Sequence, residues 1–84
     1  MENYKMQNNV AVSENGFLFL PSTGESFTLN EIGRTILEYL KEGITSDEII
    51  KRIADEYDVD KTVAERDFSD FINQLKNFRI VDSI

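Results

Sequence analysis

The chain contains no cysteine, no histidine and no tryptophan. Without cysteine it has no disulfide, no thiolate nucleophile and no iron–sulfur or cysteine-ligated zinc site. Without histidine it has no imidazole base, and a Ser-His-Asp triad cannot be built. We therefore expect no catalytic residues, no metal site and no bound cofactor.

Long apolar runs are also missing. The longest covers residues 17–20, far short of the ~20 residues that a helix needs to span a bilayer. The first five residues lack the basic-then-apolar order of a signal peptide. We expect a cytoplasmic protein that does not enter a membrane.

Basic residues are scarce relative to acidic ones. The chain has 9 Lys and Arg against 16 Asp and Glu, a formal net charge of −7. Nucleic acid is therefore not an expected partner, because its phosphates attract Lys and Arg. An acidic surface favours a basic protein surface or a cationic peptide, and it also keeps a small protein soluble.

What remains is the composition of one small folded domain. The chain has 84 residues, of which 40% are hydrophobic and 30% charged, and domains typically run to about 100–150 residues. Residues 1–8 show no periodic pattern, so we expect a flexible N-terminal arm there. Residues 9–84 are expected to form a single domain.

Short apolar stretches separated by turn residues predict three strands in the first third of the chain. The expected strands cover residues 10–12, 17–20 and 25–29. Asn15-Gly16 favours a type I′ turn, in which both central residues have positive φ. The strands are expected to form an antiparallel meander.

From residue 29 onward the apolar residues recur every three or four positions, which predicts amphipathic helices. The expected helices cover residues 31–42, 46–57 and 61–77. Asn30, Thr45 and Asp60 are suitable N-cap residues, and Gly43 suits the left-handed position after the first helix. Residues 79–82 are compatible with a short terminal strand.

Three strands followed by three helices predict an α+β domain. Helices joined by a short glycine-containing turn beside a small sheet are typical of a winged helix-turn-helix-like fold. Its third helix would be the DNA reader, but here that helix balances three acidic against three basic residues, a poor match for a polyanion. An acidic winged-helix adaptor or transcriptional regulator acting through protein–protein contacts remains an alternative.

Two groups of acidic residues are interpreted as solvated surface. The four between residues 55 and 60 do not match a calcium loop, because no glycine occupies its sixth position. Asp67 and Asp70 lie one helical turn apart with no nucleophile or second base nearby.

One glycine falls inside the first expected helix. Gly33 occupies a position where glycine costs about 1 kcal/mol relative to alanine. We expect close packing of another element as the reason.

Several strings along the chain carry a family resemblance. They are Gly24-Glu25-Ser26-Phe27-Thr28-Leu29-Asn30-Glu31-Ile32-Gly33, the link Gly43-Ile44-Thr45, and Asp67-Phe68 with Phe71-Ile72-Asn73-Gln74-Leu75. In this order the sequence resembles the PqqD family, pyrroloquinoline quinone biosynthesis protein D, over nearly the whole chain. The resemblance implies three strands followed by three helices, and a protein that is not an enzyme.

The resemblance also implies a function. Members of the family act as peptide chaperones, or recognition elements, for ribosomally made and modified peptides. They bind the leader segment of a precursor peptide and present it to a modifying enzyme, which is often a radical S-adenosylmethionine (radical SAM) protein. The expected partners here are such a leader and such an enzyme, with no nucleic acid and no membrane.

The implied mechanism is strand addition at the edge of the third strand, with the third helix as the opposite wall. Carried over to this sequence, the peptide-binding residues are Glu25, Ser26, Phe27, Thr28, Ala64, Asp67, Phe68, Phe71 and Gln74. A proline at Phe27 is expected to remove a backbone donor from that edge. An exposed edge also permits pairing between two copies, so a monomer or weak homodimer is expected.

Overall fold

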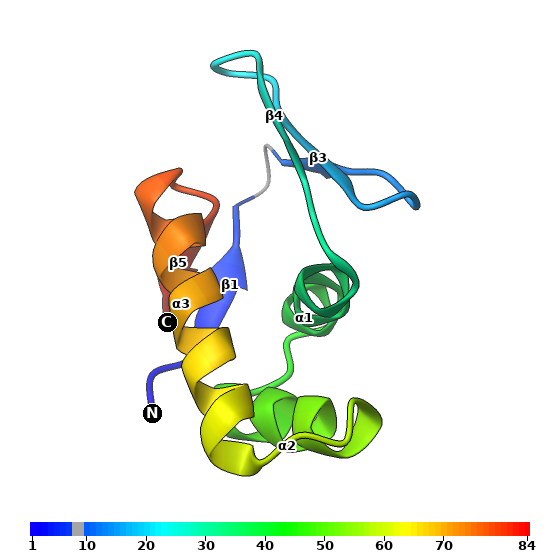
Figure 1. Cartoon of the computed structure of the whole chain (residues 1–84). Coiled ribbons are helices and arrows are strands. Elements are labelled where there is room, and N and C mark those ends of the chain that lie inside the picture. The colour runs from blue at the N-terminus through cyan, green and yellow to red at the C-terminus, as the bar shows by residue number, and fades with distance from the viewer. Residues whose placement is uncertain (8–9) are drawn as a thin grey trace.

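The computed structural model describes residues 1–7 and 10–84, and Figure 1 shows the order of the elements along the chain. The strands are β1 (Tyr4–Met6), β2 (Ala11–Val12), β3 (Phe17–Leu20), β4 (Glu25–Thr28) and β5 (Val81–Ser83). The helices are α1 (Glu31–Lys41), α2 (Ser46–Glu56) and α3 (Lys61–Asn77).

The strands β2, β3 and β4 form an antiparallel sheet with β3 in the centre. The register between β3 and β4 runs from Phe17↔Thr28 to Leu20↔Glu25. In Figure 1 this hairpin stands above α1, while α3 rises on the other side of the molecule. The predicted α+β class is confirmed, and β4 lies at an edge of the sheet.

The turn between β2 and β3 differs from the expected type I′ turn. Gly16 has a φ of 80°, whereas Asn15 is not among the residues with positive φ. The Ser13 N–H donates to the Phe17 carbonyl at 2.8 Å, and the Gly16 N–H donates to the Ser13 carbonyl at 3.1 Å. This is a three-residue connection with a left-handed glycine before the second strand, the next commonest hairpin geometry.

The helix boundaries follow the predicted capping residues. The Asn30 side chain accepts a hydrogen bond from the Gly33 N–H at 2.7 Å, which fixes the start of α1. Thr45 caps α2 in the same manner, while Asp60 precedes α3 without a side-chain cap bond. Gly43, with a φ of 77°, ends the first helix as expected.

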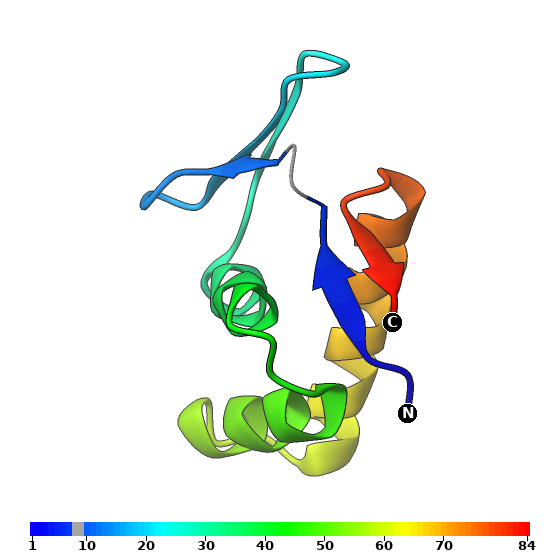
Figure 2. The same ribbon diagram turned by 180° about the vertical axis from the view of Figure 1, so that it is seen from behind.

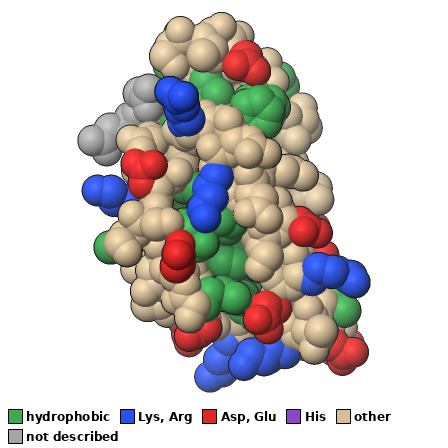
Figure 3. Space-filling model, turned by 90° about the vertical axis from the view of Figure 1, so that its left-hand side faces the viewer, with side chains coloured by type: hydrophobic (Ala, Val, Ile, Leu, Met, Phe, Trp, Pro, Cys, Tyr) green, Lys and Arg blue, Asp and Glu red, His purple; other side chains and the backbone are tan. Residues whose placement is uncertain are grey.

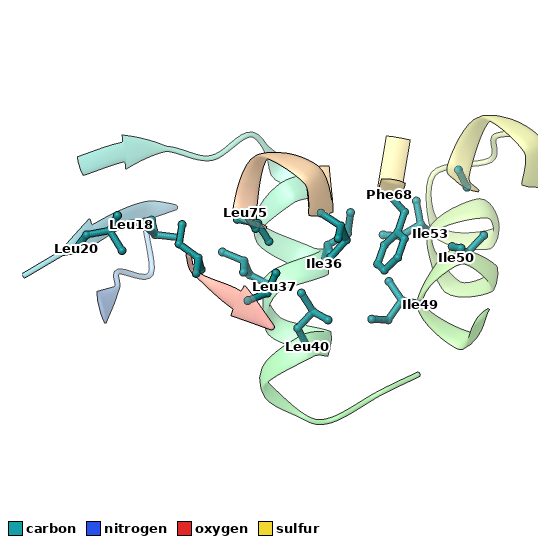
Figure 4. Close-up of a cluster of buried hydrophobic side chains, with 14 residues drawn as sticks. Leu18, Leu20, Ile36, Leu37, Leu40, Ile49, Ile50, Ile53, Phe68 and Leu75 are labelled. Atoms are coloured by element: carbon teal, nitrogen blue, oxygen red, sulfur yellow. The ribbon is translucent and has the colours of Figure 1, made fainter. Parts of the chain in front are cut away.

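The hydrophobic core joins the sheet to all three helices. Leu18, Leu37 and Ile49 are each 0% exposed. Figure 4 shows Phe68 of α3 beside the isoleucines of α2, with Leu18 and Leu20 reaching the cluster from β3. The alternation in β3 puts these leucines inside and leaves Phe17 and Phe19 on the outer face of the sheet.

The first residues do not form a loose arm in this structure. Strand β1 pairs with β5 in the register Tyr4↔Ser83 to Met6↔Val81, and Figure 2 shows the two strands side by side in front of α3. The Ser46 Oγ donates to the Glu2 carbonyl at 2.6 Å. The arm prediction is therefore wrong for residues 4–6, and the boundary expected between residues 8 and 9 lies outside the described residues.

Candidate functional site

Among residues 1–7 and 10–84, no strand pairs with the outer edge of β4. Leu29 donates its N–H to the Gly16 carbonyl at 2.7 Å, so this pair is hydrogen-bonded. Bonded and non-bonded pairs alternate along an antiparallel ladder, and Phe27 is therefore the next residue bonded to β3. The N–H and C=O groups of Ser26 and Thr28 point away from β3, toward the open edge. Phe27, which the sequence suggested for this role, faces the partner strand instead.

The hydrogen bonds between β3 and β2 lead to the same conclusion about which residues of β3 bond to β4. Ser13 donates its N–H to the Phe17 carbonyl at 2.8 Å, so Phe17 bonds toward β2 and so does Phe19, two residues further on. That alternation leaves Leu18 and Leu20 to bond toward β4. The Leu20 carbonyl points to this side of β3, because it accepts the N–H of Gly24, in the turn before β4, at 2.8 Å.

A cavity lies between the edge of β4 and α3. Its floor consists of buried side chains, Leu18, Leu75 and Ile80, and its walls include Phe27, Phe71 and Phe78. The volume is about 190 Å³, below the roughly 300–1,000 Å³ of sites that enclose a small molecule. The cavity fits an apolar side chain better than a cofactor.

Two further openings continue this cavity in opposite directions. One lies toward the start of α1, where Gly33, Asp67 and Asp70 are found, and it shares Asn30, Phe71 and Gln74 with the first. The other lies toward the β3–β4 turn and contains Glu25 and Arg79, sharing Phe78 with the first. We call these three adjoining openings the β4–α3 groove.

Residues 15–81 match the sequence profile of the family described as Coenzyme PQQ synthesis protein D (PqqD). The chain belongs to the PqqD family. A search of curated proteins finds no match.

Two solved structures share the fold of this PqqD-family chain. One is lasso peptide synthetase B1 complexed with the leader peptide, with a TM-score of 0.84, 24% identity, and coverage of 95% of this chain and 98% of that chain. The other is TbiB1 in complex with the TbiA(beta) leader peptide, with a TM-score of 0.86, 32% identity, and coverage of 93% of this chain and 94% of that chain.

The residues carried over from the PqqD resemblance fall into two sets. Glu25, Ser26, Phe27 and Thr28 form β4, and Asp67, Phe71 and Gln74 line the groove. Ala64 and Phe68 are each 1% exposed and lie in the core instead. Ala64 was expected to admit a leader side chain, and Phe68 was expected to form part of the apolar floor of the site.

The helical geometry of α3 explains this division. Its buried stripe is Ala64, Phe68, Ile72 and Leu75, whereas the groove stripe is Asp67, Phe71, Gln74 and Phe78. Each stripe has spacings of three and four, and the two are offset by about one residue, or roughly 100° around the helix. The prediction from the sequence assigned residues of both stripes to one binding face, because the spacings alone do not distinguish them.

Phe78 is a groove residue that the sequence did not single out. It lies one position beyond α3, and its ring centroid is 4.3 Å from that of Phe27 at an interplanar angle of 51°. Arg79 follows with a φ of 58°, which reverses the chain toward β5. The sequence shows only that Phe78 follows the end of the third helix. Its contact with Phe27 of β4 becomes visible only in the tertiary structure.

Charge on the groove is uneven, because its α1 end carries two carboxylates. An ion pair joins Arg66 and Asp67 at 4.0 Å, with side chains that are 69% and 45% exposed, so its contribution to stability is small. On the face shown in Figure 3, acidic and basic side chains are interspersed rather than gathered into a basic patch.

Two negative findings limit the chemistry of the described residues. Within residues 1–7 and 10–84, no group of three or more Asp, Glu, His or Cys side chains is placed to hold a metal ion. In the same residues, no helix combines the length and apolar character needed to cross a membrane.

Proposed function

We propose that this PqqD-family protein binds the leader segment of a ribosomally made precursor peptide in the β4–α3 groove and presents the peptide to a modifying enzyme. The observation that carries the proposal is the open edge of β4 beside an apolar cavity. An extended peptide that joins such an edge gains affinity from main-chain hydrogen bonds and selectivity from side-chain pockets.

The groups that bind the leader follow from the register. Ser26 and Thr28 offer their backbone N–H and C=O groups to the added strand. Alternate side chains of that strand face the groove, and one of them enters the cavity bounded by Phe27, Phe71 and Phe78. The phenylalanine walls favour an apolar leader residue at this point.

The structural comparisons support a leader as the ligand. Both similar structures are described as complexes with leader peptides, and TbiB1 is 32% identical to this chain. One of them is a lasso peptide synthetase component, so lasso-type leaders are the first candidates. Leaders from radical SAM systems are the second.

The protein itself supplies no catalytic chemistry in this proposal. PqqD-family proteins are non-catalytic partners of modifying enzymes, and the chain lacks histidine and cysteine altogether. We propose that the modifying enzyme is a separate cytoplasmic protein, a radical SAM enzyme or another maturase. Any cofactor of the reaction then belongs to that enzyme.

An amide-resolved NMR titration tests the proposal. The ligands are synthetic leader peptides encoded by short open reading frames beside this gene, with a scrambled leader as the control. We expect shifts at Ser26, Phe27 and Thr28 and at Phe71, Gln74 and Phe78. Binding should persist at moderate salt, whereas binding to DNA falls steeply with salt. Leader binding that leaves β4 unshifted, or the absence of binding by any such leader, contradicts the proposal.

A further inference from the structure

Gly33 lies in the first turn of α1, where alanine is the better helix former. Its φ is not positive, so backbone conformation does not require glycine. A Cβ built at this position lies 3.2 and 3.3 Å from Cε1 and Cζ of Phe71, and 3.1 Å from Oδ1 of Asn30. Glycine is therefore present because the Phe71 ring packs directly against the backbone of α1.

The ring of Phe71 occupies a distinctive position in the groove. It lines both the apolar cavity beside Phe27 and the polar opening that contains Asp67 and Asp70. The side chain is half-buried and has open space on two sides. The ring thus forms the wall between two subsites of different chemistry.

We propose that Gly33 is a positioning residue for leader binding: its missing side chain lets the Phe71 ring stand as the wall between the apolar and the polar subsite. This inference rests on the proposed function. It implies a leader that presents an apolar side chain to the first subsite and a polar or basic side chain to the second.

An added methyl group at Gly33 displaces the ring rather than the helix cap. The Asn30 side chain accepts the Gly33 N–H at 2.7 Å, so a shift of Asn30 breaks the cap that starts α1. The Phe71 ring has no hydrogen bond to lose, and it can turn into either opening. Because alanine also favours the helix, Gly33→Ala should weaken binding without weakening the fold.

The test compares leader affinity, thermal stability and the NMR signals of the Phe71 ring in wild type and Gly33→Ala. The probe is the synthetic leader that the wild type binds best in the titration above. We expect Gly33→Ala to bind about tenfold more weakly, which corresponds to about 1.4 kcal/mol. Its melting temperature should be unchanged or higher, and the Phe71 ring signals should shift. Glu38→Ala, an exposed change on the same helix, should alter none of these.

A double-mutant cycle separates positioning from a general structural effect. Leucine at position 71 lacks the two ring atoms that a Cβ at Gly33 meets. If Gly33 acts through the ring, Gly33→Ala should cost no further affinity in the Phe71→Leu background.

Each outcome is decisive. Wild-type affinity in Gly33→Ala, or equal losses of affinity in both backgrounds, overturns the positioning role while leader binding stands. Failure of the wild type to bind any leader overturns the proposed function and the positioning role together, whatever the ring signals show.

Discussion

Replacing Ser26 with proline is the most direct test of strand addition at β4. The register between β3 and β4 directs the Ser26 N–H away from β3, so the free protein does not use it in the sheet. Proline is tolerated at such edge positions, where the missing N–H would have faced solvent. The preceding residue, Glu25, is already in a strand, the conformation that proline favours for its neighbour.

The expected loss is confined to the complex. Without the Ser26 N–H, a carbonyl of the bound leader is left unpaired, at a cost of about 1–3 kcal/mol. Since each 1.4 kcal/mol is a factor of about ten, the dissociation constant should rise by roughly 5- to 150-fold. The free energy of unfolding should change by about 1 kcal/mol or less, because no ladder bond is removed.

Two further variants serve as controls for Ser26→Pro. Ser26→Ala keeps the N–H and should bind the leader as the wild type does. Phe27→Pro removes a donor that faces β3 and should destabilise the hairpin itself, which circular dichroism and thermal melting will show. Isothermal titration of all three variants gives the affinities. A folded Ser26→Pro protein that binds the leader with unchanged affinity would refute strand addition at this edge.

Three further substitutions probe other parts of the molecule. Asp67→Lys should weaken binding of a basic leader at low salt and leave stability within about 0.5 kcal/mol; unchanged affinity would remove Asp67 from the site. Ser46→Ala removes the bond to the N-terminal backbone and should cost about 1 kcal/mol in a chemical denaturation curve, with leader affinity retained. The hydrogen bond to Glu56, followed by burial, raises the pKa of Tyr39 above 10.0, so Glu56→Gln should lower that pKa in an NMR titration of the ring. The stabilisation from this pair is present at neutral pH and is lost as the pH rises through the raised pKa.

Local patterns were sufficient to predict the helices and the main sheet. The capping side chains of Asn30 and Thr45 and the glycine at position 43 are signals within one turn of the helix ends. Strands β3 and β4 pair as neighbours along the chain, in a simple antiparallel hairpin register. In these elements the neighbours along the chain already determine the local conformation.

Non-local contacts were the part that the sequence did not reveal. Strand β1 has three residues, and its pairing with β5 joins Tyr4 to Ser83 at the far end of the chain. No period is detectable in so short a segment. For the groove, the sequence identified the correct helix but not which of two stripes 100° apart faces β4, because that rotation is set by the packing of α3 on α2.

The pairing of β1 with β5 gives the N-terminal residues an influence on the groove. The Gln7 N–H donates to the Ile80 carbonyl at 2.8 Å, and Ile80 is 1% exposed in the groove floor. Figure 2 shows both chain ends far from the β3–β4 hairpin, and this hydrogen bond is what links the N-terminal segment to the groove floor. Shortening the chain at its start removes a strand rather than a tail, and with it a support beneath the pocket.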